Sequence, residues 1–217
     1  MSEVNLVALS KPSAGTGCST ASELVAYAAR VSNPTNQNNT ETAPRLIKYL
    51  IKHAHWSPLE MVHMTLEIKT TRDISRQILR HRSFSFQEFS QRYAVSEHFT
   101  EREARLQDET NRQNSIETDE EHIKHEWMHS QARVRNFAKK EYQQALKMGI
   151  AKEQARALLP EGLTETTLYM AGSLRSWIHY CQLRMENGTQ KEHMEVANQC
   201  WKVIKQHFPE VVEALEE

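Results

Sequence analysis

The sequence predicts a mixed α/β fold of the α+β type, mostly helical, in which helices flank a small mixed sheet. Residues 62–69 alternate apolar and polar side chains, the pattern of a half-buried strand, and residues 4–9 are a short apolar stretch suited to a second strand. Most other segments carry apolar residues at helical spacing. The length of 217 residues favours a single domain over residues 1–217.

The first half of the chain contains three predicted helices. One is expected over residues 21–31. A second runs through Ile51 and begins after Thr40 or Thr42, either of which can act as its cap. The third covers residues 71–80, directly after the alternating strand. In each of these segments the apolar residues recur three or four positions apart, so we expect each helix to bury one face.

The second half is expected to be helical almost throughout, after a solvated excursion over residues 100–121. That stretch is highly charged and nearly free of apolar side chains. A long amphipathic helix follows it, and glycine or proline residues mark the ends of several helices. The predicted helices cover residues 120–148, 152–159, 164–184, 191–208 and 210–215, and the third of them begins within residues 164–170.

Charge and cysteine content exclude several classes of protein. The chain has 27 basic and 28 acidic residues and a formal net charge of -1, whereas a general nucleic-acid binder usually has a basic excess. No apolar run approaches the ~20 residues of a membrane span, and the N-terminus lacks the features of a signal peptide. Three widely spaced cysteines argue against a disulfide framework. We therefore expect a cytoplasmic protein that binds neither nucleic acid nor membrane.

Residues 80–93 form the densest polar cluster of the sequence, RHRSFSFQEFSQRY. Three arginines, a histidine, a glutamate and three serines alternate there with four aromatic residues. An arginine fork can bind phosphate oxygens in pairs, and an aromatic ring can flank a base or a flavin. Gln77 and Arg80 are three residues apart and would share a helix face. The cluster is typical of a nucleotide cradle. The alternatives are a solvated helix end, or a non-catalytic nucleotide- or RNA-binding module that uses Arg80, Arg82 and Arg92.

This cluster and three other segments resemble the motifs of flavin-dependent thymidylate synthases, in the family's order. Arg80-His81-Arg82, seven further residues and Ser90 fit the family signature, and the continuation through Tyr93 resembles its S-x-R-Y sequence. The other segments are residues 53–60, HAHWSPLE, similar to H-x-[ST]-P-[FL]-E; residues 155–160, ARALLP, similar to A-R-x-x-L-P; and residues 173–184, SLRSWIHYCQLR, similar to the last helical motif. One match alone would be weak, whereas four in order make the resemblance strong.

The resemblance implies an enzyme that converts dUMP to dTMP, with active sites shared between the subunits of a homotetramer. Methylenetetrahydrofolate would be the carbon donor, and reduced FAD, recycled by NADPH, the hydride donor. For the dUMP site the resemblance implies Arg184, as the catalytic residue that polarises the uracil, with Gln77, Arg80, Glu88, Phe89, Ser90, Gln91, Arg92 and Arg156. For the FAD site it implies His55, Ser57, Arg80, His81, Arg82, Glu88, Ser173, Arg175 and His179.

Two of the FAD positions depart from some family members, because Ser173 and His179 stand where those members have asparagines. Serine and histidine can still hydrogen-bond a flavin. Ser173 and Arg184 are eleven residues apart, about three helical turns, and would point to one face of the predicted helix. Arg175 and His179 would form an i, i+4 pair. An arginine suits the chemistry, because uracil is a poor nucleophile and a fixed positive charge stabilises the negative charge that develops on it.

Residues 125–129 read His-Glu-Trp-Met-His, a literal HExxH sequence and the helical signature of zinc peptidases. His125 and His129 would share a helix face, with His122 one turn earlier, and Glu126 would be the general base. The surrounding segment is strongly polar, which favours a water-facing helix over a buried active site. A zinc peptidase is therefore the rival enzyme class, whereas the family resemblance requires no metal.

Three further residues have a mechanistic interpretation and a structural one. Ser90 has no G-x-S-x-G elbow around it, so a ligand role is favoured over a nucleophilic one. Cys181 lacks the neighbouring proline of the cysteine-dependent thymidylate synthases, so packing within a helix is favoured. Trp177 is expected in the core or at an interface, and a contact with the flavin is the alternative.

Overall fold

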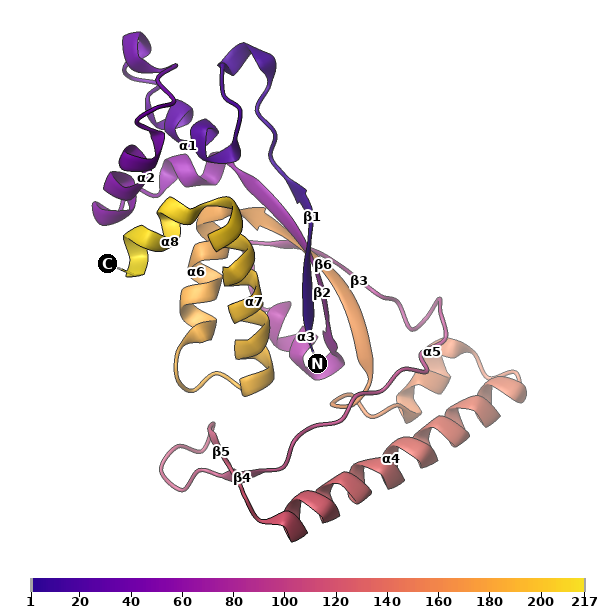
Figure 1. Cartoon of the computed structure of the whole chain (residues 1–217). Helices are drawn as coiled ribbons and strands as arrows, with labels where there is room; N and C mark the ends of the chain where they lie inside the picture. The colour runs from indigo at the N-terminus through magenta and orange to yellow at the C-terminus, as the bar shows by residue number, and fades with distance from the viewer. Residues whose placement is uncertain (1, 217) are drawn as a thin grey trace.

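The computed structural model describes residues 2–216 and has a four-stranded sheet at its centre (Figure 1). Every pairing in this sheet is antiparallel. The predicted α+β class is confirmed, but the expected mixed sheet is wrong. Antiparallel sheets can leave one face without a covering layer, and this sheet does so. Its strand order is β1 (Glu3–Leu9), β2 (His63–Thr71), β6 (Glu165–Ser173) and β3 (Ser85–Glu88).

One face of the sheet is buried and the other is open. Along β2 the side chains of Met64, Leu66 and Ile68 are buried, while the positions between them are partly or fully exposed. On β6, Leu168 and Met170 are buried in the same way. This period of two follows from the alternation of side chains along a strand. Two helices pack against the buried face (Figure 1), α6 (Leu174–Met185) and α7 (Lys191–His207), and α8 (Pro209–Glu216) packs against α7.

Two helices near the N-terminus complete the packed body. α1 (Ala21–Ala29) begins with a capping box, in which Thr20 and Glu23 each accept a hydrogen bond from the backbone of the other. α2 (Ala43–Lys52) contributes buried aliphatic residues to the core. A 3-10 helix (Ser57–Met61) then leads into β2. The helices and the two strands predicted in this part of the chain are confirmed.

The segment predicted as one helix over residues 164–184 is a strand followed by a helix. β6 pairs with β2 along its whole length, and α6 begins only at Leu174, with Ser173 as its N-cap. The helix prediction fails because Thr166, Thr167 and Tyr169 favour a strand once partner strands are available to pair with them. The prediction placed Ser173 and Arg184 within one helix, whereas Ser173 is the N-cap of the helix that carries Arg184.

The core beneath α6 is built around aromatic side chains. Trp177 is fully buried, and its indole N–H donates to the carbonyl of Met64 at 3.0 Å. The ring of Phe84 packs edge-on against Trp177, with ring centroids 4.8 Å apart. Trp177 therefore belongs to the core, and its alternative contact with a flavin is wrong. Cys181 is fully buried in the same core, which confirms its packing role.

The helix α4 (Glu121–Lys147) projects from the body as a long arm (Figure 1). Gly149, with a φ of 83° in the left-handed region, ends it as predicted. The helix predicted over residues 152–159 is present in a shortened form, as α5 (Lys152–Ala155) and a 3-10 turn (Arg156–Leu158). The buried residues of α4 are few: Gln131, Ala138, Tyr142 and Ala145.

Most side chains of residues 100–121 are exposed, which agrees with the predicted solvated excursion, but two arginines anchor the segment to the body. Arg102 lies 2.8 Å from a carboxylate oxygen of Asp73 and 2.8 Å from one of Glu192. Arg105 pairs with the same Glu192. Composition misses this anchoring because ion pairs between distant segments, not apolar contacts, hold it. The segment also contains a short hairpin of two strands, β4 (Arg105–Gln107) and β5 (Ser115–Glu117).

The three cysteines are free thiols, as their spacing predicts. Burial raises the pKa of Cys181 and of Cys200, so both stay protonated and pack as small apolar groups. None of the helices formed by residues 2–216 combines the length and the apolar character that crossing a membrane requires.

Gly172 on β6 allows the close approach of Phe84, and we predict that Gly172→Ala destabilises the protein by about 1–3 kcal/mol, a typical cost of overpacking. A Cβ at this position would lie 2.5 Å from Cδ1 of Phe84, whose ring is held against Trp177. Urea unfolding measures the change. Gly15→Ala is the matched control, because a Cβ there meets no atom within 4 Å. Equal stability of the two variants would contradict this packing.

Candidate active site

Two helices that carry predicted site residues meet because of the strands that precede them. α3 (Arg72–Ile78) follows β2 directly, and α6 follows β6 directly. Since β2 and β6 are antiparallel, the two helices start at opposite ends of the ladder. α6 has 12 residues and extends about 18 Å back along the sheet. Its last turn therefore reaches the turn that follows α3, which brings Arg184 beside His81.

Arg184 and His81 form a direct hydrogen bond. The Nε–H of Arg184 donates to Nε2 of His81 at 2.9 Å. Burial, together with the charges of Arg184, His179 and Arg80, lowers the pKa of His81 to about 4. The imidazole is therefore neutral near pH 7 and can accept this bond. No other hydrogen bond or ion pair within residues 2–216 engages Arg184, so its terminal nitrogens are available to a ligand.

Gln77 is half-buried in the last turn of α3 and belongs to the same group. Its Nε2 donates to Oε1 of Gln190 at 2.7 Å, and its Oε1 lies 3.3 Å from Nδ1 of His193. Arg80 is exposed in the turn that follows α3, because the helix ends at Ile78. The prediction that Gln77 and Arg80 share a helix face is therefore wrong, since only Gln77 lies within the helix.

Glu88 on β3 is held by neighbouring side chains of the fold. Its Oε1 accepts hydrogen bonds from the hydroxyls of Ser75 at 2.7 Å and Thr166 at 3.0 Å. Its carboxylate also lies 3.3 Å from a guanidinium nitrogen of Arg72 and 3.3 Å from one of Arg76. These four partners, which sequence reasoning missed, dock β3 against α3 and β6.

The segment after β3 leads away from Arg184. The backbone N–H of Phe89 donates to the carbonyl of Thr167 at 2.9 Å, and the buried amide of Gln91 lies 3.4 Å from the hydroxyl of Ser96. Ser90 between them is exposed. No histidine hydrogen-bonds its hydroxyl within the described part of the chain, so Ser90 has no general base beside it. This geometry favours Ser90 as a ligand.

Arg92 and Arg156 form a second basic group at the base of the α4 arm. Nε of Arg92 lies 3.3 Å from Oε2 of Glu153, and Nε of Arg156 donates to the carbonyl of Glu153 at 3.3 Å. Figure 1 shows α5, which precedes Arg156, beside α4 and away from α6. No hydrogen bond or ion pair between described residues joins this pair to His81 or Arg184. One chain therefore presents the predicted dUMP residues as two separate groups.

The N-terminus of α6 carries a third group of predicted site residues. The hydroxyl of Ser173 and Nη1 of Arg175 both donate to the carboxylate of Glu60, the latter at 2.8 Å. The hydrogen bond from Ser173 is the largest effect that lowers the pKa of Glu60. His179 is exposed one turn after Arg175, which confirms their predicted i, i+4 spacing. Glu60 was missed as a partner, although it closes the HAHWSPLE segment.

The other residues predicted for the FAD site are exposed. His55 and Ser57 lie in the loop and the first position of the 3-10 helix before β2, and Arg82 lies in the turn between α3 and β3. The ring of His55 lies near that of Tyr49, with centroids 6.1 Å apart. The predicted FAD residues therefore come from three parts of the chain, and most of them face solvent.

Behind Gln77 lies a buried polar set that sequence reasoning missed. Tyr180 and His193 are fully buried, with the Tyr180 hydroxyl 3.1 Å from Nε2 of His193. His193 lies at helical spacing with the buried apolar residues Val196 and Cys200 of α7. A histidine within an apolar helix face is the signal that could have pointed to this set.

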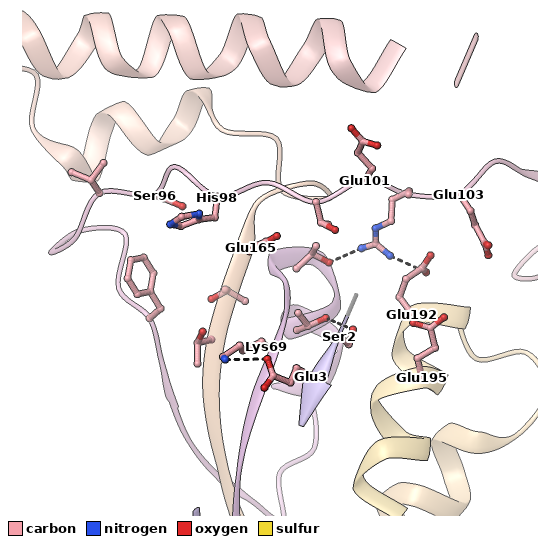
Figure 2. A pocket seen from close by; sticks show the side chains of 18 residues that line it. Ser2, Glu3, Lys69, Ser96, His98, Glu101, Glu103, Glu165, Glu192 and Glu195 are labelled. Carbon is pink, nitrogen blue, oxygen red and sulfur yellow. Dashed lines mark hydrogen bonds and ion pairs between the residues drawn. The ribbon is translucent and has the colours of Figure 1, made fainter. Parts of the chain in front are cut away.

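A cavity of about 480 Å³ lies elsewhere, between the segment near residue 100 and the end of the sheet at which β2 ends and β6 begins (Figure 2). Of the predicted site residues, only Phe89 lines it. Glutamates outnumber the cations Lys69 and Arg102 in its lining, and their charge disfavours a nucleotide phosphate. Six glutamates line it: Glu3, Glu101, Glu103, Glu165, Glu192 and Glu195.

The HExxH segment lies on the exposed surface of α4. The Nε2 atoms of His125 and His129 are 2.9 Å apart, and both side chains face solvent. Among residues 2–216, no group of three or more histidine, cysteine, aspartate and glutamate side chains is placed to hold a metal ion. A catalytic zinc site needs three protein ligands. The rival zinc peptidase therefore lacks support, and the prediction of a solvated helix face is confirmed.

Known sequences match nearly the whole chain. Residues 17–210 match the family described as thymidylate synthase complementing protein. The chain is 51% identical over 212 residues to a probable flavin-dependent thymidylate synthase of Paramecium bursaria Chlorella virus 1, covering 97% of each chain. It is also 51% identical over 193 residues to a flavin-dependent thymidylate synthase of a Synechocystis species, covering 89% of this chain and 88% of the relative.

A solved structure shows the same arrangement of elements. The UMP/dUMP methylase PolB from Streptomyces cacaoi, in its crystal structure with 5-Br dUMP, superposes with a TM-score of 0.84 and 29% sequence identity. The match covers 100% of this chain and 95% of that one. The agreement of motifs, sequence relatives and fold shows that the chain belongs to the family of flavin-dependent thymidylate synthases.

Proposed function

We infer that this protein converts dUMP to dTMP, with methylenetetrahydrofolate as carbon donor and reduced FAD, recycled by NADPH, as hydride donor. The observation that carries the inference is the hydrogen bond between His81, from the Arg-His-Arg signature, and Arg184, from the last motif. Two motifs far apart in the sequence thus build one surface. The 5-Br dUMP bound to the similar methylase supports a uridine nucleotide as the ligand.

The group around Arg184 suits the uracil, and the exposed arginines suit the phosphate. Arg184 is held through Nε, which leaves its terminal nitrogens to donate to a carbonyl oxygen and to an adjacent ring atom. Gln77 adds an amide beside it. Forked donors bind phosphate oxygens in pairs. The proposed phosphate and sugar ligands are Arg80, Ser90, Arg92 and Arg156, with the backbone of residues 88–91 wrapped around the nucleotide.

Arg184 is the proposed catalytic residue. Methylene transfer needs a nucleophilic carbon 5, which uracil gains as an enolate-like anion whose negative charge is shared with its carbonyl oxygen. A cation that is fixed there before the reaction stabilises this charge, and arginine does not lose its proton in proteins. Cys181 cannot replace this effect by covalent attack, since it is fully buried and burial raises the pKa of its thiol.

Exposed donors of the turn between α3 and β3 and of the first turn of α6 suit a flavin dinucleotide. Arg82 and Arg175 are exposed cations that can pair with its diphosphate, and Arg175 is steadied by Glu60. When bound, FAD supplies the hydride that reduces the transferred carbon, and the chain orients the reactants around it. The other proposed FAD ligands are His55, Ser57, Arg80, His81, Glu88, Ser173 and His179, whose side chains offer hydrogen-bonding groups.

The geometry also favours a homotetramer whose sites combine residues from different copies. Arg92 and Arg156 lie apart from Arg184 within one chain, although all three are proposed to bind the same nucleotide. The arm α4 exposes Val134 and Phe137 by 52% and 68%, three residues apart on one side of the helix. A projecting arm with exposed apolar residues is suited to contact a second copy.

The purified protein tests the proposed function. We expect it to show the visible absorption of an oxidised flavin, to lose that absorption with NADPH, and to form dTMP when dUMP and methylenetetrahydrofolate are added. The zinc-peptidase and nucleotide-binding alternatives predict a colourless protein. A preparation that neither binds added FAD nor forms dTMP would exclude the proposed function.

Arg184→Lys tests the role of the catalytic arginine. Lysine keeps the charge but loses the planar fork, so we expect dTMP formation in a single turnover to slow by about 100-fold to 1,000-fold. Affinity for dUMP should fall by less, and reduction of the bound flavin by NADPH without dUMP should be spared. Arg45→Lys, at an exposed position of α2, is the control. A variant slowed only in flavin reduction would show that Arg184 serves the cofactor instead.

Mixed tetramers test whether sites are shared between copies. Copies with Arg184→Ala lack one dUMP group, and copies with Arg156→Ala lack the other, so each variant alone should be nearly inactive. In a random mixture of equal amounts, about a quarter of the shared sites receive both intact groups, and activity should return to that fraction. A mixture of Arg184→Ala with Gln77→Ala, both in one group, should be no more active than the average of the two variants measured alone. Mixed tetramers without any gain in activity would contradict the shared site.

A further inference from the structure

His193 on α7 is completely buried and uses both nitrogens of its ring. Its Nδ1 lies 3.3 Å from Oε1 of Gln77, and its Nε2 lies 3.1 Å from the hydroxyl of Tyr180. Burial, together with the charges of Arg184 and His81, lowers the pKa of His193 to about 3. The ring is therefore neutral near pH 7 and carries one proton, which sits on one of the two nitrogens.

The carboxylate of Glu192, at the other end of this chain of hydrogen bonds, determines which nitrogen of His193 carries the proton. The ionised carboxylate of Glu192 only accepts, so Gln190 faces it with its amide nitrogen, at 2.9 Å. Oε1 of Gln190 then faces Gln77, which presents its Nε2 at 2.7 Å. Oε1 of Gln77 is left for His193, whose Nδ1 must carry the proton. Nε2 of His193 then accepts from Tyr180, and every bond from Tyr180 to Glu192 runs in one direction.

Glu192 fixes this direction because it stays ionised. Burial acts to raise the pKa of Glu192, but the hydrogen bond from Arg105 and the charge of Arg102 outweigh burial and lower the pKa to about 2. A protonated Glu192 could donate instead of accept, and both amides could then reverse. The two arginines prevent this near neutral pH, so the anchored segment of residues 100–121 also sets the polarity of the buried set.

We propose that His193 is a positioning residue that holds the Gln77 amide in one orientation toward the nucleotide. The proposal rests on the proposed function, in which Gln77 contacts dUMP. Beyond its bonds to Gln190 and His193, Gln77 keeps one N–H and one lone pair of Oε1 for a ligand. A reversed amide would exchange the donor and the acceptor that the nucleotide meets. Reversal would set the oxygen of Gln77 against that of Gln190 and would break the bond from Nδ1–H of His193, so His193 adds to the effect of Gln190 in holding the orientation.

The second contact of His193 connects Gln77 to Arg184. Tyr180, which donates to His193, packs edge-on against the ring of His81, with centroids 4.8 Å apart. His81 in turn accepts the hydrogen bond from Arg184. Gln77 and Arg184, both assigned to the uridine nucleotide, are thus held by one buried set of side chains.

Two variants of similar polarity separate the two bonds of His193. Asparagine places its amide nitrogen near the position of Nδ1, so His193→Asn keeps a donor for Gln77 and loses the bond to Tyr180. Glutamine reaches the position of Nε2, so His193→Gln keeps an acceptor for Tyr180 and loses the donor to Gln77. We expect the Kd for dUMP to rise about threefold to tenfold in His193→Gln and less than about twofold in His193→Asn, as the loss of one neutral hydrogen bond predicts. KM should follow Kd, with a smaller change in kcat.

A double-mutant cycle shows whether His193 acts through Gln77. In the Gln77→Ala background, His193→Gln should weaken dUMP binding no further. Equal losses in the two His193 variants, or the full effect of His193→Gln without the Gln77 side chain, would overturn the proposal. An unchanged dUMP affinity of Gln77→Ala alone would overturn the assignment of Gln77 as well, which distinguishes a wrong site from a wrong role of His193.

A test on the wild-type enzyme does not depend on whether any variant folds. In the enzyme labelled with 15N-histidine, NMR reports which ring nitrogen carries the proton. We expect a proton on Nδ1 of His193, none on Nε2, and no titration between about pH 6 and 8. A proton on Nε2, or a titration in this range, would overturn the proposal.

Discussion

The antiparallel pairing of β2 with β6 is the constraint on which the rest of the site depends. Its register places Thr71 opposite Glu165 at one end and His63 opposite Ser173 at the other. α3 leaves one end of the ladder and α6 the other, so the last turn of α6 meets the turn after α3 on the side of the sheet that the helices cover. A slip of one residue would turn the apolar side chains of β6 to the open face. Burial along this ladder therefore sets the position of Arg184.

Where helix ends meet over the core, polar side chains enter apolar surroundings. Each of these side chains then needs a hydrogen-bond partner. A buried group left without one costs about 1–3 kcal/mol. Here Tyr180, His193 and Gln77 satisfy one another, and Arg184 is satisfied by a neutral His81. The bonds that make burial tolerable also aim the side chains proposed to bind the nucleotide. Stability and the orientation of the site thus come from the same contacts.

The spacing of apolar residues predicts the helices and strands that bury one regular face. The order of the motifs predicts most of the candidate site residues. The strand β6 was not predicted, because it forms by pairing with β2, about 100 residues earlier in the chain. The anchoring of Arg102 escaped because Glu192, its partner, lies in α7. The bond from Ser173 to Glu60 and that from His193 to Gln77 join segments more than 100 residues apart. No local pattern reports such pairs, so the motifs predict which residues matter but not how they are held.

The central claim is that one chain supplies two separate dUMP groups, which become one site only when copies assemble. A crystal structure of the enzyme with bound dUMP tests this claim most directly. We expect a nucleotide whose uracil contacts Arg184 and Gln77 of one copy, while Arg92 and Arg156 of another copy bind its phosphate. A nucleotide held by all four residues of a single chain, or seated in the glutamate-lined cavity beside Glu192, would contradict it.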